Sequence, residues 1–568
     1  MNNDETTTVN VAKYLKAQAE NKPFKRAVVY PYGTDAQGRI TYSHLTFRQL
    51  DLQSDKLARG LETIGISRGV KTILMVKPSL DFFVLTYALF KVGAVPVVVD
   101  PGMGVKRMIQ CLQSTGAEAF IGIPLAHVLR TVAYKSFTSV KIWVTVGKKL
   151  FWGGYTLDDI RDISDESYDY VKTTADETAA ILFTTGSTGP AKGVVYTHGT
   201  FDAQVRNIQA HFKIGDDEID LPTFPLFALF DPAIGMTAII PDMDPTKPAH
   251  VNPVKIIEAI ENQGVTNMFA SPALLNRVGK YGKENGVKLP SLRRVVSAGA
   301  PVSPSNIEQF TAMFEGDAQV HTPYGATEAV PILSIASDEI LSETKQFSED
   351  GYGTCIGRPI EDADIKIIKI FDGPIPTWSD DLLVDKGEVG EITVKGSLVT
   401  RNYFNNPEAD SLAKIQEDDG IRHRMGDLGW RDNSGRIWFC GRKNHRVETS
   451  EGTLYTISCE AIFNKHTDVY RSALVGLGEK GQQTPVIIVE MKQGANRRSQ
   501  NHVKNELLAL AQTFENTKNI KNFLFHKSFP VDIRHNSKIF REKLAVWAVE
   551  KLGFTQDLSP DVTEEQDR

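Results

Sequence analysis

VTNMFASP (265–272), RRVVSAGAP (293–301) and AQVHTPYG (318–325) are three apolar runs that end in small or polar residues, each separated from the next by a helical pattern. This alternation is typical of an α/β domain with a parallel sheet. The second intervening helix has a clear start signal, because Ser303 can cap it and Pro304 suits its first position. Ligands of open α/β sheets bind beyond the carboxyl ends of the strands. We therefore expect the segments SPA, SAGAP and YGATE to meet at one cleft.

The same alternation extends over roughly the first 440 residues and predicts more buried strands and amphipathic helices. After Arg442 the pattern changes to a few strands and charged helices, which indicates a small α+β unit. We predict an N-terminal domain at 1–442, a C-terminal domain at 443–553 and an acidic, disordered tail at 554–568. The clearest predicted elements of the N-terminal domain are the strands KTILMV (71–76), AVPVVVD (94–100), EAFIGI (118–123) and VKIWVTV (140–146) and the helix FRQLDLQSDKLARGLETIG (47–65).

Composition narrows the class of protein. A chain of 568 residues with 41% hydrophobic content can form more than one core. The net charge of -6, without a basic and aromatic stripe, argues against nucleic-acid binding. The polar start MNNDETTTVN is not a signal peptide, and the most apolar stretch, 82–90, is too short to span a bilayer, although it leaves peripheral lipid contact open. We expect a cytoplasmic protein with reduced, buried thiols at Cys111, Cys355, Cys440 and Cys459, since no CxxC pair or zinc spacing occurs.

The loop TTGSTGPAKG (184–193) follows the strand-like run ETAAILF (177–183) and has the composition of a polyphosphate site. Its three glycines let successive backbone N–H groups turn toward an anion, its four hydroxyls add donors, and Lys192 adds a positive charge. Ala191 precedes the lysine, so this is not the Gly-Lys-Ser/Thr loop of common nucleotidases. Taken alone, a loop of this composition is as often a connecting segment that binds no phosphate. The candidate phosphate ligands are Thr184, Thr185, Gly186, Ser187, Thr188, Gly189 and Lys192.

This loop resembles the phosphate signature of the adenylate-forming superfamily, which includes acyl-CoA synthetases, peptide-synthetase adenylation domains and luciferases. The resemblance covers about residues 20–550 and implies a large multi-sheet N-terminal domain with a small mobile C-terminal lid. It also implies that a carboxylic acid and ATP react to acyl-AMP and pyrophosphate. The other motifs of the superfamily follow in order as YGATE (324–328), GEVGEITVKGSLVTRNYFNNPE (387–408), GDLG (426–429), GR (441–442) and NSKI (536–539).

These motifs suggest which residues hold the nucleotide. Tyr324, followed by Gly325, can stack on adenine, and Asp427 can accept hydrogen bonds from both ribose hydroxyls. The resemblance places Arg442 in the same region. The close-approach wall of the adenine pocket is expected to be formed by Gly299, Ala300 and Pro301.

Three residues are predicted to act on the reacting groups. Glu328 is suited to hold a Mg²⁺ ion that bridges ATP oxygens, and the resemblance implies a contact from Thr327 to the α-phosphate. Lys538 is the expected catalytic lysine, because a cation between the carboxylate and the α-phosphate offsets their repulsion. The superfamily has Gly before this lysine, whereas this chain has Ser537. The resemblance also implies that the C-terminal domain rotates about a hinge at Asn444.

Three segments depart from ordinary acyl-CoA ligases: DPGMG (100–104), FPLFALFD (224–231) and KNHRVETSEGTLYT (443–456). The third lacks the two acidic residues and the Lys-x-x-Gly stretch that typically line the CoA tunnel. Together these segments resemble the β-lactone synthetases of bacterial long-chain olefin biosynthesis. That resemblance implies adenylation of a 2-alkyl-3-hydroxy fatty acid, whose own hydroxyl then closes a lactone without CoA. A long alkyl chain suits the aromatic pocket predicted from Phe224, Phe227 and Phe230.

Two alternatives stay open at this stage. A long- or medium-chain fatty acid–CoA ligase would need CoA in addition to ATP and Mg²⁺. A catalytically silent ATP-binding relative is disfavoured by the intact motif residues. No base for the 3-hydroxyl is evident, although His198 and His445 are candidates. The expected partner is the small-molecule acyl substrate, with other enzymes of the olefin pathway as further candidates; oligomeric state is open.

Overall fold

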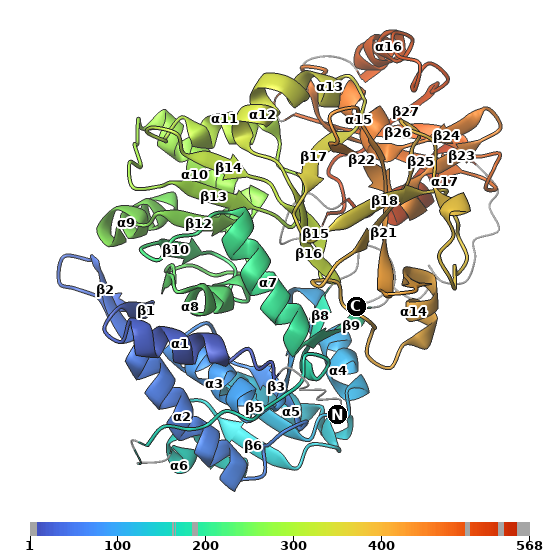
Figure 1. The fold of residues 1–568 in the computed structure, drawn as a ribbon. Helices are drawn as coiled ribbons and strands as arrows, with labels where there is room; N and C mark the ends of the chain where they lie inside the picture. Colours follow the sequence, from blue (N-terminus) through green and yellow to red (C-terminus); the bar gives the residue numbers. More distant parts are fainter. Residues whose placement is uncertain are drawn as a thin grey trace.

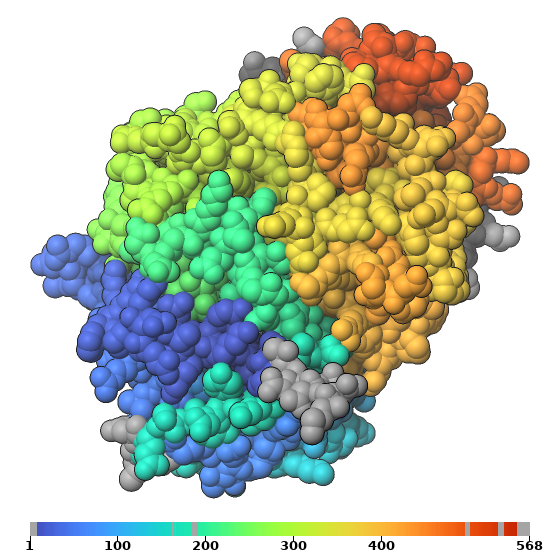
Figure 2. Space-filling view, in the orientation of Figure 1, coloured from blue at the N-terminus to red at the C-terminus, as the bar shows by residue number. Residues whose placement is uncertain are grey.

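The computed structural model describes residues 8–161, 164, 166–184, 191–492, 494, 500–531 and 539–553. Figure 1 shows two sheets flanked by helices in the N-terminal half, a third sheet beside them, and a smaller C-terminal unit at one end. Figure 2 shows the C-terminal residues, in orange and red, standing against the yellow part of the chain. The structure confirms the predicted α/β class with a large N-terminal and a smaller C-terminal part.

The first sheet contains the three strands predicted within residues 265–272, 293–301 and 318–325. Neighbouring strands are parallel except for the β1–β2 hairpin, and the Ser303 hydroxyl accepts a bond from the Asn306 N–H at 3.2 Å, so the predicted helix start is confirmed. The order across the sheet is β14 (Gln319–His321), β13 (Arg294–Ser297), β12 (Asn267–Ala270), β10 (Ile219–Pro222), β11 (Thr237–Ile239), β1 (Arg26–Thr34) and β2 (Ile40–Thr46). Its helices are α1 (Lys13–Asn21), α7 (His198–His211), α8 (Phe230–Ile234), α9 (Pro253–Gln263), α10 (Pro272–Glu284) and α11 (Pro304–Thr311).

The second sheet is formed by the predicted apolar runs. Its strands are parallel apart from the β8–β9 hairpin, and its helix α2 begins with a capping box between Thr46 and Gln49. The order is β7 (Tyr155–Thr156), β6 (Ile142–Thr145), β5 (Ala119–Gly122), β3 (Lys71–Met75), β4 (Val95–Val99), β8 (Thr178–Thr184) and β9 (Lys192–Thr197). Its helices are α2 (Phe47–Thr63), α3 (Leu80–Lys91), α4 (Val105–Ser114), α5 (Pro124–Val132) and α6 (Leu157–Ile160), with 3-10 turns at η1 (Pro101–Met103) and η2 (Tyr134–Phe137).

The third sheet is antiparallel and leads into the C-terminal part. Its order is β15 (Tyr324–Ala326), β16 (Ala329–Ser334), β17 (Thr354–Pro359), β22 (Ile437–Arg442), β21 (Gly420–Arg431), β19 (Gly390–Lys395) and β18 (Asp364–Ile368), with β20 (Lys414–Glu417) beside β21. Short helices at its margin are α12 (Ser337–Glu339), α13 (Lys345–Glu349) and α14 (Pro407–Ala413).

The C-terminal part is the small α+β unit that the sequence predicts. A 3-10 turn, η7 (Lys443–His445), connects it to β22. Its strands are β23 (Val447–Thr449), β24 (Gly452–Leu454), β25 (Val469–Leu477), β26 (Thr484–Met491) and β27 (Asn522–Phe525), and its helices are α15 (Thr456–Asn464), α16 (Gln500–Ala511) and α17 (Arg541–Leu552). The predicted tail at 554–568 lies outside the described residues. All four cysteines are buried, and no described helix is long and apolar enough to cross a membrane.

Candidate active site

A cavity of about 2230 Å³ lies at the carboxyl ends of β12, β13 and β14. It is lined by the loop residues that the sequence expects there: Ser271 after β12, residues 297–304 after β13 and residues 322–328 after β14. The three parallel strands hold these loops side by side, which is why segments far apart in sequence border one space. The structure therefore brings SPA, SAGAP and YGATE together as predicted.

Gly299 gives the SAGAP loop its shape. Its φ of 93° lies in the left-handed region that favours glycine, and Ala300 and Pro301 follow it along the cavity wall. Beside them, the Ser297 hydroxyl is buried without a hydrogen-bond partner among the described residues. A buried hydroxyl at a cavity wall can bond to a ligand that enters it.

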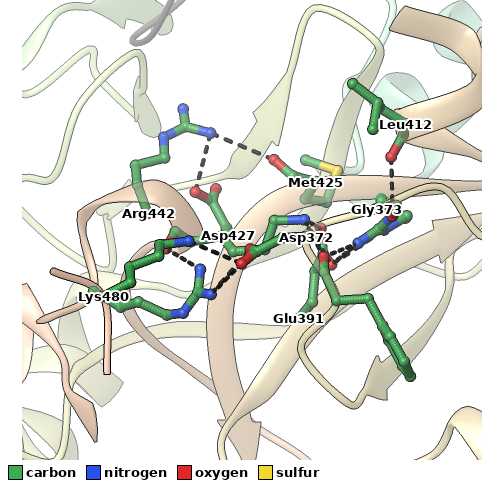
Figure 3. Close-up of polar contacts among 12 residues, drawn as sticks. Asp372, Gly373, Glu391, Leu412, Met425, Asp427, Arg442 and Lys480 are labelled. Atoms are coloured by element: carbon green, nitrogen blue, oxygen red, sulfur yellow. Dashed lines mark hydrogen bonds and ion pairs between the residues drawn. The ribbon is translucent and has the colours of Figure 1, made fainter. Parts of the chain in front are cut away.

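A buried carboxylate, Asp427, stands at the polar end of the cavity. The Tyr324 hydroxyl donates to its Oδ2. The Arg442 Nη1 lies 3.0 Å from its Oδ1, as Figure 3 shows. Asp427 is on β21 and Arg442 ends β22, where the two residues are cross-strand partners. Burial raises the pKa of Asp427, while the nearby Arg442 opposes this rise. Asp427 therefore lies at this end of the cavity with one carboxylate oxygen bonded to Tyr324 and the other beside Arg442.

Glu328 and Thr327 are fixed by two tyrosines. The Tyr403 hydroxyl donates to Glu328 Oε1 at 2.6 Å, and the Tyr196 hydroxyl donates to the Thr327 carbonyl. The Lys192 ammonium lies 5.0 Å from the centre of the Tyr403 ring, so it approaches the same corner of the cavity. Sequence reasoning missed Tyr403, although it lies inside the quoted block 387–408. Only its aromatic character in that block could have drawn attention to it.

The donor set at Glu328 suits a magnesium ion that is shared with a nucleotide. The described residues contain no group of three or more His, Cys, Asp or Glu side chains placed to hold a metal. Mg²⁺ in phosphoryl-transfer sites is commonly bound by one or two carboxylates together with substrate phosphate oxygens and water. One cavity-lining carboxylate is therefore compatible with such an ion only when ATP supplies the other ligands.

The predicted phosphate loop lies partly outside the described residues. Residues 185–190, which include Thr185, Gly186, Ser187, Thr188 and Gly189, are not described, and neither is the Thr184 side chain. The backbone of Thr184 ends β8 and pairs with Lys192 at the start of β9. The loop thus connects two strands of one hairpin, and Lys192 lines the cavity at its base. Lys538 also lies outside the described residues.

The other end of the cavity is apolar. Phe224, Phe227 and Phe230 all line it, as the sequence predicts. The Phe227 ring lies 4.3 Å from that of Phe269 and 5.4 Å from that of Phe224, measured between centroids. Because the apolar and polar ends belong to one cavity, a single ligand can place a nucleotide at one end and an alkyl chain at the other.

The match to a protein-family model classifies this chain. The model of the AMP-binding enzyme family matches residues 15–404, which contain both the phosphate loop and YGATE. The chain belongs to the AMP-binding enzyme family. Its relatives include an olefin β-lactone synthetase of Xanthomonas campestris pv. campestris, 46% identical over 96% of this chain and 98% of the relative. The olefin β-lactone synthetase of Stenotrophomonas maltophilia is 47% identical over the same shares.

Two solved structures share the fold of this chain. An amide bond synthetase from Marinactinospora thermotolerans superposes with a TM-score of 0.77 at 21% identity, covering 95% of this chain and 99% of that one. An o-succinylbenzoate coenzyme A synthetase from Bacillus subtilis, solved in complex with AMP, gives 0.71 at 20% identity, with 94% and 97% covered. At these identities the likeness concerns the fold alone.

In this AMP-binding enzyme, the two histidines predicted as candidate bases lie in different environments. His198 is buried, accepts a bond from the Val11 N–H at 3.3 Å, and does not border the cavity; burial lowers its pKa to about 4. His445 does border the cavity, and its Nε2 lies 3.0 Å from Glu542 on α17. Asn444 beside it is exposed in η7, which suits a position about which the chain could turn.

The residues around η7 join the AMP-binding part to the C-terminal part through two ionic clusters (Figure 3). In the first, Glu391 on β19 lies 2.6 Å from Arg424 and 3.0 Å from Lys443. Both Glu391 and Arg424 have side chains that are only 1% exposed. Sequence reasoning did not single out this cluster, because its three members come from separate segments.

The second cluster is centred on Asp372, in the loop after β18. Its carboxylate lies 2.8 Å from Arg446 and 2.8 Å from Lys480. These bonds hold the pKa of Asp372 well below its usual range. Lys443 and Arg446 belong to the segment that departs from acyl-CoA ligases, so two bases of that segment are bound to the large part of the enzyme.

Proposed function

We propose that this enzyme activates a long-chain 2-alkyl-3-hydroxy fatty acid as its acyl-AMP and then closes it to a β-lactone. The observation that carries the proposal is the identity of 46–47%, over 96% of the chain, to two olefin β-lactone synthetases. The cavity agrees with it, since one continuous space joins a carboxylate-bearing polar end to a phenylalanine-lined apolar end. ATP and Mg²⁺ are the cofactors that this reaction requires.

In the first step a carboxylate oxygen of the acid attacks the α-phosphorus of ATP. The new P–O bond forms as the bond to the β-phosphate oxygen breaks, and pyrophosphate leaves. Asp427 would hold the ribose and Tyr324 the adenine. Thr327 and Lys192 would contact phosphate oxygens, and Glu328 would hold Mg²⁺, which supplies charge neutralisation when bound.

Lys538 would bridge the two anionic reactants, with residues 443–553 acting as the lid that delivers it and Asn444 as the hinge. A positioned cation contributes by orienting the attack and offsetting charge in the transition state. The ion pairs of Lys443 and Arg446 with the large part would hold the lid during this step.

In the second step the 3-hydroxyl oxygen attacks the acyl carbon, the bond from that carbon to the AMP oxygen breaks, and AMP leaves. The departing phosphate can take the hydroxyl proton, so no external base is required. An intramolecular nucleophile has a high effective concentration, which favours ring closure over attack by an outside thiol. His445 is the cavity-lining histidine nearest the hinge and is a second candidate acceptor.

The decisive experiment compares products with and without CoA. Enzyme, ATP, Mg²⁺ and a 2-alkyl-3-hydroxy acid should give the lactone in the absence of CoA, with one AMP and one pyrophosphate per lactone. The matched substrate lacking the 3-hydroxyl should support ATP–pyrophosphate exchange and give no lactone. Product only with CoA would establish the fatty acid–CoA ligase instead, and release of AMP with unchanged acid would refute ring closure.

Lys538→Ala tests the role of the lysine. It should lower ATP–pyrophosphate exchange by about 10²-fold or more, since a transition-state cation is lost while the ribose and adenine contacts remain. ATP binding, measured by calorimetry, should change little. Lys527→Ala, an exposed lysine of the same C-terminal part, is the matched control and should keep full exchange. Unchanged exchange in Lys538→Ala would remove the lysine from the mechanism.

A further inference from the structure

The apolar end of the cavity extends well past the phenylalanines. It continues between the second sheet and the segment that contains η1, α4 and α5, where Met103, Met108, Ile123 and Leu129 line it. Some of the side chains that line the cavity at this segment are also exposed on the protein surface. The apolar end of the cavity, which we call the apolar arm, therefore reaches solvent at this segment.

The exposed side chains at this opening are apolar. On α5, Leu125, Val128 and Val132 are 73%, 37% and 78% exposed, and their spacing of three and four residues places them on one helix face. Val105, the first residue of α4, is 58% exposed, and Tyr134 in η2 is 63% exposed. We call these five residues the portal patch. Single exposed apolar residues are ordinary, whereas a group of them at the mouth of an apolar cavity marks an interaction surface.

Basic residues adjoin the portal patch along the chain. Residues 101–151 contain seven Lys or Arg and a single acidic residue, Glu118, although the whole chain carries a net charge of -6. Lys106 and Arg107 follow Val105 on α4, and Lys135 follows Tyr134 in η2; all three bases are exposed. An apolar face flanked by lysine and arginine is the pattern of a segment that rests on an anionic lipid surface.

We propose that the portal patch docks on an anionic bilayer and that the acyl substrate enters the apolar arm directly from the lipid phase. The apolar side chains would insert among the acyl chains while the bases pair with headgroup phosphates. This inference rests on the proposed function in one respect, since it requires a substrate with long alkyl chains. Such an acid resides in membranes rather than in water, because each buried CH₂ group favours the apolar phase.

Flotation with lipid vesicles tests the docking without any substrate. The wild-type enzyme should bind vesicles of phosphatidylcholine and phosphatidylglycerol in equal parts, and should bind phosphatidylcholine vesicles more weakly. Leu125→Ser/Val132→Ser should abolish binding to both. Lys106→Gln/Lys135→Gln should weaken binding to the anionic vesicles by roughly tenfold or more, with little effect on the neutral ones.

Matched controls come from the first sheet and its helices, remote from α4 and α5 in Figure 1. Tyr32→Ser removes a side chain that is 82% exposed on β1, in the β1–β2 hairpin. Lys280→Gln/Lys283→Gln removes two charges from α10. Both variants should bind vesicles like the wild type. Equal weakening by these controls, or binding that ignores lipid charge, would overturn the proposal.

A kinetic measurement separates this inference from the proposed function. Lys106→Gln/Lys135→Gln should raise the KM for a long-chain acid carried in anionic vesicles by about tenfold. For a short, water-soluble 2-alkyl-3-hydroxy acid, its kcat and KM should equal those of the wild type. Vesicle binding together with CoA-dependent product would leave the portal in place and refute lactone formation. Absence of vesicle binding, with Leu125→Ser/Val132→Ser converting an oligomer to a monomer in ultracentrifugation, would assign the patch to protein association instead.

Discussion

Two buried carboxylates, Asp427 on β21 and Glu391 on β19, lie on neighbouring strands in different surroundings. Glu391 pairs across the strands with Leu428, the residue next to Asp427. Asp427 is 3% exposed and Glu391 is 1% exposed, and each lies against positive charge. They are therefore close in space and alike in chemistry.

The difference lies in their partners. Asp427 is held by one arginine and one tyrosine hydroxyl, and it borders the polar end of the cavity, so its oxygens can also accept bonds from a ligand. Glu391 is shared between Arg424 and Lys443, and Arg424 in turn donates to the backbone carbonyls of Gly373 and Leu412 (Figure 3). One carboxylate thus suits a ligand, whereas the other joins two parts of the chain.

The largest expected effect follows from the ligand-facing carboxylate. Asp427→Asn should lower kcat/KM for ATP by about 10²- to 10³-fold, because it removes the charge that pairs with Arg442 and one ribose acceptor. ATP–pyrophosphate exchange measures this loss. Asp419→Asn should stay near wild type, because this side chain is 76% exposed in the turn between β20 and β21. A loss below tenfold would remove Asp427 from nucleotide binding.

Glu391→Gln should act on stability more than on ATP affinity. It leaves Arg424 and Lys443 without their counter-charge, and breaking a buried ion pair costs about 3–5 kcal/mol. Denaturant unfolding, followed by tryptophan fluorescence, measures the change. Glu388→Gln, an exposed residue three positions earlier, is the control. A stable Glu391→Gln with strongly weakened ATP binding would reverse the roles assigned to the two carboxylates.

The sequence singles out Asp427 as a candidate but not the contacts of Glu391, and the reason is physical. The GDLG motif is a short contiguous stretch that contains Asp427, so the resemblance of this motif to that of the superfamily identifies Asp427 as a candidate. Alternating apolar runs likewise predicted β3 to β6 and the strands around the cleft, because strand and helix periods are local properties. Glu391 lies inside a recognised block, yet its partners come from β21 and η7. Only the folded chain shows which charges meet.

The Asp372 cluster should give a smaller effect. Asp372→Asn should lower the adenylation rate roughly twofold to fivefold without changing ATP affinity, because its carboxylate is 52% exposed and water screens the pair. Arg446→Ala should lower the adenylation rate further than Asp372→Asn does, since the Arg446 side chain is only 5% exposed and also donates to the Lys443 carbonyl. A double-mutant cycle on pyrophosphate release isolates the pair. Additive losses would show that the contact does not hold the lid.

The smallest effect is a difference in acid sensitivity between the two regions. Burial raises the pKa of Asp427, so its carboxylate takes up a proton at a higher pH than an ordinary aspartate and ATP binding should weaken first on acidification. Arg446 and Lys480 lower the pKa of Asp372, so its contribution is complete above the unfolded pKa of about 3.9 and is lost only as pH falls below it. Calorimetric ATP affinity and the coupling between Asp372 and Arg446, both measured from pH 7 to pH 4, test this order. Loss of this coupling at a higher pH than the loss of ATP affinity would contradict the order, because Asp372 would then titrate ahead of the buried Asp427.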